Sequence, residues 1–319
     1  MENGGNPRRI DVHHHIFPPI YKTRARDQIM ASATIGDNSP LFDWTPGAAL
    51  GLMDSYGVAT AMTSISTPGI WFGDAAEARS LARACNDYAA EMARNHPGRF
   101  GIFASLPLPD RDGSLREIEH VYDVLKADGI CLLTSYGDKW PGDPVFDEVF
   151  AELDRREAVV FVHPTVPFCC RGLIPGIPPA ITEFVFDTTR AITSLLINGT
   201  FARYPRIRYI FCHAGGTVMP ISYRIAGSGQ RNPKIAQANP GGVLEQMKRL
   251  YYDIATSANP PAMAALRSLV PLSQILFGSD NPFVPLAATA TTMDAFGFTA
   301  EEARAINRDN ALRLFPRLA

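Results

Sequence analysis

The chain has 319 residues, of which 46% are hydrophobic, so it is long enough to bury a large core. Its formal net charge is −2 and it has no block of basic residues longer than a pair such as Arg8-Arg9, which argues against nucleic acid as a partner. It has neither a signal-like N-terminus nor an apolar run of membrane-spanning length, so we expect a cytoplasmic protein with no membrane partner.

Strand-like and helix-like segments alternate along the chain. Short apolar runs predict eight strands, over 9–15, 58–66, 99–108, 129–135, 158–164, 207–213, 249–255 and 273–280. Helical periodicity predicts helices over about 45–57, 74–95, 114–127, 145–157, 181–201, 218–226 and 299–314. Thr45, Asp74 and Ser114 are the predicted N-caps of the first three helices. A polar loop is expected from 227 to 240.

This alternation predicts a single (β/α)8 barrel domain, a TIM barrel of the α/β class, over residues 1–319. An open, doubly wound sheet alternates in the same way, but it would leave the first and last strands far apart. Two segments rich in proline and glycine, 16–44 and 164–180, are too long for simple turns. We expect both of them to fold over the functional site.

Histidines and one aspartate stand at the ends of four predicted strands. His13 and His15 end the first strand and share a face because side chains alternate along a strand. His163, His213 and Asp280 end the fifth, sixth and eighth strands, so a closed barrel brings all five to its C-terminal mouth. A lone histidine at a strand end is usually a core or surface residue, but five residues in one pattern favour a site for a divalent metal.

Four motifs carry a family resemblance. IDVHHH, FVHPT, FCHAGG and LFGSDNPF, in this order and spacing, resemble the metal-dependent amidohydrolase superfamily over essentially the whole chain. Within it the chain is similar to the branch of aminocarboxymuconate semialdehyde decarboxylase and the hydroxybenzoate decarboxylases. The resemblance implies an amidohydrolase-type barrel in which His13, His15, His163 and Asp280 are the metal ligands and His213 is an acid/base or substrate-orienting residue.

The resemblance also bears on the metal and on assembly. Dinuclear members carry a carboxylated lysine at the end of the fourth strand, where this chain reads GICLLTSYG, so we expect one metal ion. Three imidazoles and a carboxylate accept zinc, our first choice, or manganese. Self-association into a dimer or tetramer is an expectation from the family alone.

The segment EFVFDTTRAITSLLINGTFARYPRIRYIFCHAGGT resembles the decarboxylases of salicylate-type acids such as 6-methylsalicylate. It implies a metal-dependent, nonhydrolytic decarboxylase of a small hydroxylated aromatic acid, with the ring carbon protonated as carbon dioxide leaves. Asp280 is the first candidate for the proton donor, and His213 would orient or share that proton. The same residues suit a mononuclear hydrolase of a lactone or amide, which stays open as the alternative.

Candidates for substrate binding rest on weaker patterns. Arg224 stands eleven residues after His213, where the family offers an arginine that binds the substrate carboxylate, although an exposed helix arginine would look the same. Trp71 and Phe283 follow the second and eighth strands, and we expect them to line a pocket for a flat ring, although loop aromatics more often pack locally.

Four further residues have less defined roles. His14 should face away from His13 and His15 and is predicted to be structural. Asp187 and Arg190, at i, i+3 spacing, form either an ion pair on a helix surface or part of the pocket lining, and the pattern leaves both open. Cys212 is expected to point away from the site because it precedes His213 in a strand, which argues against a nucleophilic role.

Overall fold

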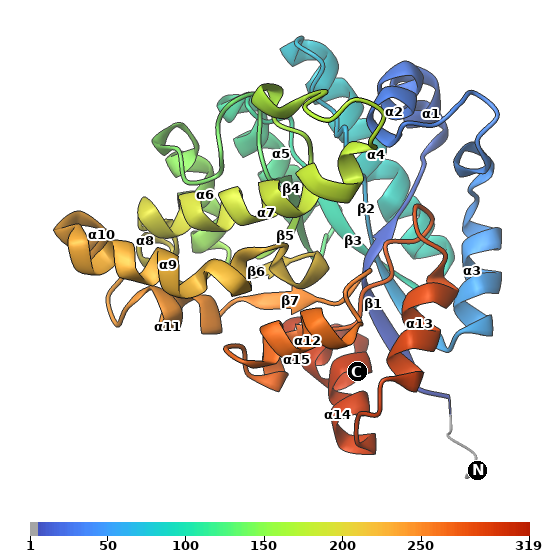
Figure 1. The fold of residues 1–319 in the computed structure, drawn as a ribbon. Coiled ribbons are helices and arrows are strands. Elements are labelled where there is room, and N and C mark those ends of the chain that lie inside the picture. The colour runs from blue at the N-terminus through green and yellow to red at the C-terminus, as the bar shows by residue number, and fades with distance from the viewer. Residues whose placement is uncertain (1–5) are drawn as a thin grey trace.

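Eight parallel strands form the centre of the molecule (Figure 1). The computed structural model describes residues 6–319, and the strands pair in chain order from β1 to β8. Their bounds are β1 Arg9–His15, β2 Val58–Ser64, β3 Phe100–Ser105, β4 Gly129–Leu133, β5 Val159–His163, β6 Arg208–Phe211, β7 Tyr251–Asp253 and β8 Ile275–Leu276.

Hydrogen bonds between β1 and the segment that follows β8 close the barrel. The N–H of Val12 donates to the carbonyl of Phe277 at 3.0 Å, and the N–H of Asp280 donates to the carbonyl of His13 at 2.8 Å. A further bond of 2.7 Å runs from His15 N–H to the carbonyl of Asn281. The predicted closed barrel is therefore confirmed, and the open-sheet alternative is excluded.

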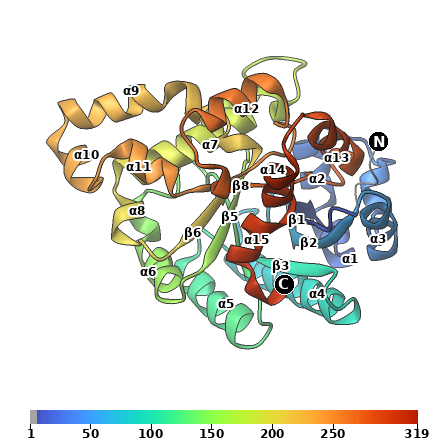
Figure 2. The same ribbon diagram turned by 90° about the horizontal axis from the view of Figure 1, so that it is seen from below.

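Helices surround the strands, as the view from below shows (Figure 2). Most predicted helices are present, with Thr45 and Asp74 as N-caps that accept from backbone N–H groups three residues on. The helices are α1 Pro19–Arg24, α2 Arg26–Ala33, α3 Pro46–Ser55, α4 Ala75–Asn95, α5 Arg111–Asp123, α6 Asp147–Arg155, α7 Pro179–Ile197, α8 Thr200–Arg203, α9 Val218–Arg231, α10 Pro233–Ala238, α11 Val243–Lys248, α12 Pro260–Arg267, α13 Leu286–Ala295, α14 Ala300–Arg304 and α15 Asn310–Leu314.

The structure corrects several sequence-based boundaries. Asp110, not Ser114, caps α5, because its carboxylate accepts from the N–H of Gly113 and starts the helix at Arg111. The expected loop 227–240 is mostly helical, since α9 runs on to Arg231 and α10 follows. The segment 16–44, expected as a loop, contains α1 and α2. The sequence interpretation also missed α11, α12 and α13. All five helices are short or lack a clear apolar period.

Apolar side chains also fill the interior of the barrel. The rings of Phe103 and Phe161, from β3 and β5, stack with centroids 5.3 Å apart. Leu314 and Phe315 join this buried group from the end of α15. The barrel is thus a packed core that supports the side chains at its mouth.

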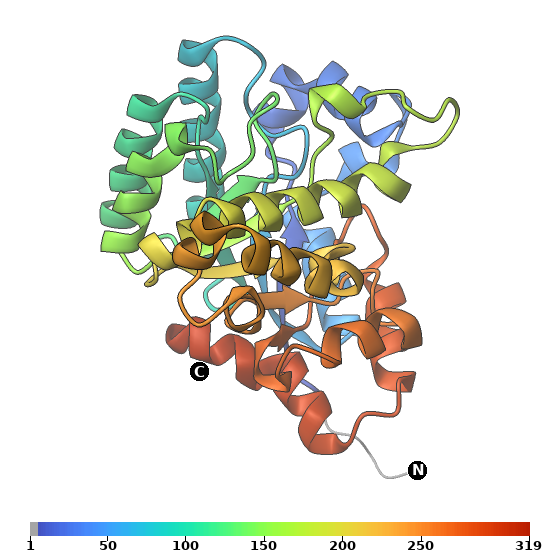
Figure 3. The same cartoon turned by 60° about the vertical axis from the view of Figure 1, so that its left-hand side comes forward.

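The two long segments lie together at one end of the barrel. Figures 1 and 3 show the loop before α7 beside α1 and α2. Residues from both segments, including Ser32 and Thr165, line one cavity of about 720 Å³. None of the helices in the described range 6–319 has the length and apolar character needed to cross a membrane.

Candidate metal centre

Four of the predicted site residues meet at the C-terminal ends of the strands. Ligand atoms of His13, His15, His163 and Asp280 all lie within 4.8 Å of one another. The Nε2 atoms of His13 and His15 are 3.0 Å apart, and Asp280 Oδ1 lies 3.3 and 3.1 Å from them. The three imidazoles are buried, whereas the Asp280 side chain is 13% exposed. The cluster therefore opens to solvent on the side of Asp280.

The outer nitrogen of each imidazole is held by a hydrogen-bond acceptor, which leaves Nε2 free to face the centre of the cluster. The acceptors are a carboxylate, a hydroxyl and a carbonyl: Asp253 Oδ2 for His13 at 3.0 Å, Ser64 Oγ for His15 at 3.1 Å, and the carbonyl of Pro164 for His163 at 2.9 Å. Metal-binding histidines are oriented in this way, because an Nδ1–H bond fixes the tautomer that presents an Nε2 lone pair. The donor set fits a divalent cation.

The electrostatics of the cluster agree with that fit. Burial lowers the pKa of His163 well below its usual value, so this imidazole is neutral. Burial also acts against a charged His13, but the carboxylates of Asp253 and Asp280 outweigh it and raise the pKa of His13 to about 10. Burial opposes ionisation of Asp280 too, yet the charge of His13 and bonds from the imidazoles hold its pKa well below the usual range. A positive charge is thus stabilised at this point.

Asp253 is a functional residue that the sequence interpretation missed. It ends β7, and its carboxylate accepts from the backbone N–H of His213 at 3.0 Å as well as from His13. Gly278 makes this contact possible, because a Cβ there would lie 2.8 Å from Cβ of His13 and 2.9 Å from that of Asp253. The available signal was an aspartate near the end of the predicted strand 249–255, close to the position that Asp280 takes in the eighth strand.

Replacing Asp253 by asparagine is expected to weaken metal binding about 10–100-fold, the usual effect of losing an outer partner of a metal-binding histidine. The substitution keeps the shape of the side chain but removes the anionic acceptor of His13. Metal affinity measured by competition with a chelator checks this. The matched control is Asp37→Asn, an exposed carboxylate that pairs with Arg26 and should leave the affinity unchanged. An affinity equal to that of the control would contradict the role of Asp253.

His213 lies beside the four-residue cluster. Its Nε2 is 3.4 Å from Oδ2 of Asp280, on the carboxylate oxygen that does not face His13 and His15. Its Nδ1 is buried and has no hydrogen-bond partner within residues 6–319. His213 and Ala214 both have φ of 54°, so the chain leaves β6 by a sharp turn at this point. The geometry allows His213 to exchange a proton with Asp280.

That turn also bears on Cys212, which has extended backbone and faces the barrel interior below the cluster. The expectation that Cys212 points away from the site is wrong, since its Sγ lies with ligand atoms of His13 and Asp253 in a second group within 4.8 Å. The left-handed conformation of His213 ends the alternation of side chains on which the expectation rested. Burial raises the pKa of the Cys212 thiol well above its usual value, and the thiol donates to the carbonyl of Val162. It is a protonated core group, and a nucleophilic role is not supported.

His14 points away from the cluster, as predicted. Its Nδ1 is 3.0 Å from Asp11 Oδ2, and its Nε2 is 3.2 Å from Nδ2 of Asn281. The side chain is fully buried, and these contacts join β1 to the segment after β8. His14 therefore stabilises the closure of the barrel.

The predicted substrate-binding residues differ in position. The ring of Phe283 is 5.5 Å from that of His15, so it lies against the cluster. Trp71 is half-buried and lines the 720 Å³ cavity with Phe72 and Phe168, on loops at the same end of the barrel. Arg224 is exposed on α9 and has no hydrogen bond or ion pair within the described range. The structure thus brings Phe283, but not Arg224, into contact with the cluster.

Asp187 is not the surface residue that its spacing to Arg190 suggested. Its carboxylate is fully buried and accepts from the hydroxyls of Thr134 and Ser135 and from Nε1 of Trp140, while Arg190 stays 3.7 Å away. Burial raises its pKa, although these hydrogen bonds act in the opposite direction. Asp187 thereby ties α7 to the segment after β4.

The Asp187→Ala variant is expected to lower the free energy of unfolding by about 3 kcal/mol, because it leaves three buried donors without an acceptor at roughly 1 kcal/mol or more each. Asp187→Asn should restore part of this loss, since the amide offers an oxygen and the hydroxyls can rotate. Denaturant unfolding checks both variants. In the matched control Asp112→Ala, an exposed carboxylate of α5, the change should stay within about 0.5 kcal/mol. A loss no larger than in the control would show that the network is dispensable.

Comparisons with known proteins agree with the fold. The sequence model of the amidohydrolase family matches residues 10–317. The chain is 36% identical to decarboxylase yanB of Aspergillus niger, with 97% of this chain and 88% of that protein covered. It is 34% identical to 6-methylsalicylic acid decarboxylase of Penicillium expansum, with 97% of both chains covered.

Solved structures share the fold. A structure described as an amidohydrolase II is 30% identical, covers 97% of this chain and is itself covered to 99%, with a TM-score of 0.87. The 5-carboxyvanillate decarboxylase of Novosphingobium aromaticivorans, solved with manganese and 4-hydroxy-3-methoxy-5-nitrobenzoic acid, is 20% identical with a TM-score of 0.86. That alignment covers 97% of this chain and 96% of the other. At this identity it supports the barrel fold alone.

Proposed function

Because the chain belongs to the amidohydrolase family, we propose that it is a metal-dependent decarboxylase of a small hydroxylated aromatic acid of the salicylate or 6-methylsalicylate type. The observation that carries the proposal is its likeness, over 97% of the chain, to relatives that are decarboxylases. The four-residue cluster supports it, because an open side next to a proton-exchanging pair is what such a reaction needs.

We assign the metal to His13, His15, His163 and Asp280, which together would supply three imidazole nitrogens and one carboxylate oxygen, with His13 losing its proton as the metal binds. This set leaves open positions for substrate, as in catalytic rather than closed structural sites. When bound, a divalent cation supplies Lewis acidity, which draws negative charge onto the oxygen atoms of the acid and of its ortho hydroxyl. One ion per chain, zinc or manganese, is the expected content.

Asp280 and His213 would supply the proton. Asp280 is ionised in the resting site, so in the proposed step it first takes a proton from His213, 3.4 Å away, and then delivers it to the ring carbon that carries the carboxylate, where a new C–H bond forms. The C–C bond to the carboxylate then breaks, its electron pair restores the aromatic ring, and carbon dioxide leaves. His213 regains its proton from solvent between turnovers.

Aromatic residues near the cluster suit a flat substrate. Phe283 lies edge-on to His15, and an aromatic ring bound beside them would be shielded from water. Trp71 lines the cavity from which such a substrate would enter. The binding of the substrate carboxylate by Arg224 stays a prediction. Self-association as a dimer or tetramer also stays a prediction.

The test is carbon dioxide release from 2-hydroxybenzoate, 6-methylsalicylate and 2,6-dihydroxybenzoate, with the bound metal quantified by elemental analysis. We expect release with about one metal per chain and none after chelation. In deuterated water the product should carry one deuterium at the former carboxyl position. The matched control is 3-hydroxybenzoate, which lacks the ortho hydroxyl and should not react.

A second outcome would support the alternative function. If fully metallated protein releases no carbon dioxide from these acids but hydrolyses a lactone or amide, the protein is a hydrolase. In that case Asp280 would act as a base rather than as a proton donor.

A further inference from the structure

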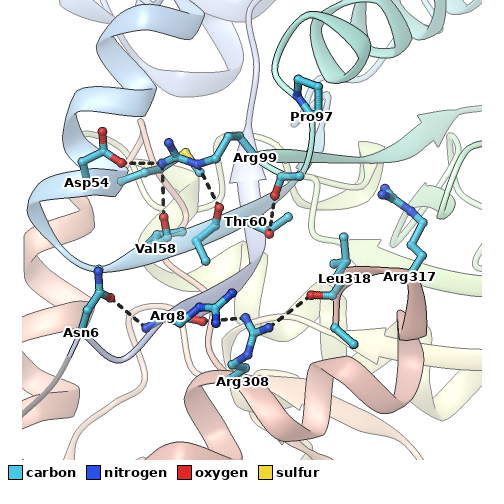
Figure 4. Close-up of a pocket in the computed structure, with 15 residues that line it drawn as sticks. Asn6, Arg8, Asp54, Val58, Thr60, Pro97, Arg99, Arg308, Arg317 and Leu318 are labelled. Atoms are coloured by element: carbon cyan, nitrogen blue, oxygen red, sulfur yellow. Dashed lines mark hydrogen bonds and ion pairs between the residues drawn. The ribbon is translucent and has the colours of Figure 1, made fainter.

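A cavity at the opposite end of the barrel has no role in the proposed reaction. It has a volume of about 690 Å³ and lies where β1, β2 and β3 begin, whereas the metal cluster lies where strands end. Figure 4 shows residues from the start of β1, from β2, from the turn before β3 and from the last turns of the chain around it. We call this cavity the arginine pocket, after Arg8, Arg99, Arg308 and Arg317, which line it.

Positive charge predominates in the arginine pocket. Its lining contains four arginines against one acidic side chain, Asp54, and the terminal carboxylate of Ala319, in a protein whose formal net charge is −2. Asp54 pairs with Arg99 at 2.6 Å, and Arg317 pairs with Asp128. Two arginines, Arg8 and Arg308, have no ion pair within residues 6–319.

Arg8 and Arg308 lie side by side (Figure 4). The guanidinium of Arg308 donates to two neutral backbone carbonyls, those of Arg8 at 3.1 Å and of Leu318 at 3.2 Å. Burial and the neighbouring charge of Arg8 lower the pKa of Arg308. The adjacent carboxylate of Asp309 opposes this lowering only in part, and it forms its own ion pair with Arg304 at 2.8 Å. Within residues 6–319 these two neighbouring cations have no acidic side chain as a partner, so a bound anion would lower their mutual repulsion.

We propose that the arginine pocket binds a phosphoryl group, either as free phosphate or as a phosphate monoester. A phosphate dianion neutralises the two unpaired arginines, and its oxygens match the forked donors of guanidinium groups. The cavity volume lies within the range of about 300–1,000 Å³ typical of small-molecule sites, so an organic group attached to the phosphate has room as well. The site is independent of the proposed decarboxylation.

Calorimetric titration of the metal-loaded protein with inorganic phosphate and with adenosine 5′-monophosphate tests the proposal. We expect binding that weakens as salt is added. Arg308→Gln and Arg8→Gln should each lower the affinity about tenfold or more, because each removes a charged donor. The glutamine amide can still donate to a backbone carbonyl, and Arg8 is exposed, so both variants should fold. The matched control is Arg313→Gln on α15, exposed and outside the pocket, with a change of less than about twofold.

A second arm separates the arginine pocket from the metal, which also attracts phosphate. Binding should persist after chelation and in Asp280→Asn. Loss of binding in either case, or unchanged affinity in both Arg308→Gln and Arg8→Gln, would overturn the proposal. Tighter binding of the monoester than of phosphate would identify an organic phosphate as the ligand, and the reverse would identify free phosphate. Citrate binding as tightly as either would overturn the assignment to a phosphoryl group.

Discussion

Replacing His163 by alanine is expected to remove bound metal and turnover together, whereas replacing His213 by alanine should remove turnover and leave the metal bound. His163 presents Nε2 to the cluster and has its Nδ1 held by a backbone carbonyl, so its loss takes one of four proposed ligands. His213 is outside the four-residue group. Its only polar contact with a member of that group is the one between its Nε2 and Asp280. Loss of a general acid or base typically costs about 10²–10⁴-fold in rate.

Elemental analysis after dialysis, together with kcat for carbon dioxide release, separates these two effects. The expected pattern is a low metal content for His163→Ala and a content near that of the unchanged protein for His213→Ala. His120→Ala is the matched control, because His120 pairs with Asp87 on the outer helices and should change neither quantity. Equal loss of metal from the His163 and His213 variants would contradict the division of roles proposed above.

The barrel and the members of the metal cluster could be predicted from the sequence because both follow from the burial of the strands. Each strand reads as a short apolar run because it is buried on both faces, and polar residues stand at or just after the ends of several strands because these ends form the mouth of the barrel. His13, His15, His163 and Asp280 all follow this rule, so their positions in the chain indicated that they meet. The contact of the first and last strands then followed from the closure of the barrel.

The remaining features depend on contacts that no local pattern encodes. The role of Asp253 follows from its distances to His13 and His213, which are set by the pairing of β7 with β6 and by the close approach of His13 and Asp253 beside Gly278. The i, i+3 pair of Asp187 with Arg190 is present at 3.7 Å, but the burial of Asp187 depends on partners about fifty residues earlier in the chain, which the spacing does not reveal. The sequence also does not show the left-handed conformation of His213, which places its side chain at the mouth of the barrel although Cys212 before it faces the barrel interior.

Replacing Asp280 by asparagine is expected to lower kcat for carbon dioxide release about 10²–10⁴-fold, even when the metal is saturating. The amide preserves the shape of the side chain but removes its charge and its capacity to donate and regain a proton. Asp280 joins both halves of the site, since Oδ1 faces His13 and His15 and Oδ2 faces His213. The variant therefore tests whether Asp280 acts chemically or only holds the metal.

Metal titration of Asp280→Asn, with kcat measured at each point, distinguishes the two roles. If the carboxylate only holds the metal, excess metal should restore kcat, because three imidazoles remain to bind it. If Asp280 delivers the proton, kcat stays low at full occupancy while the KM for substrate changes little. Asp37→Asn is the control, and it should titrate as the unchanged protein does. Full recovery of kcat by excess metal would contradict the role of Asp280 as proton donor and would leave His213, beside the cluster, as the candidate.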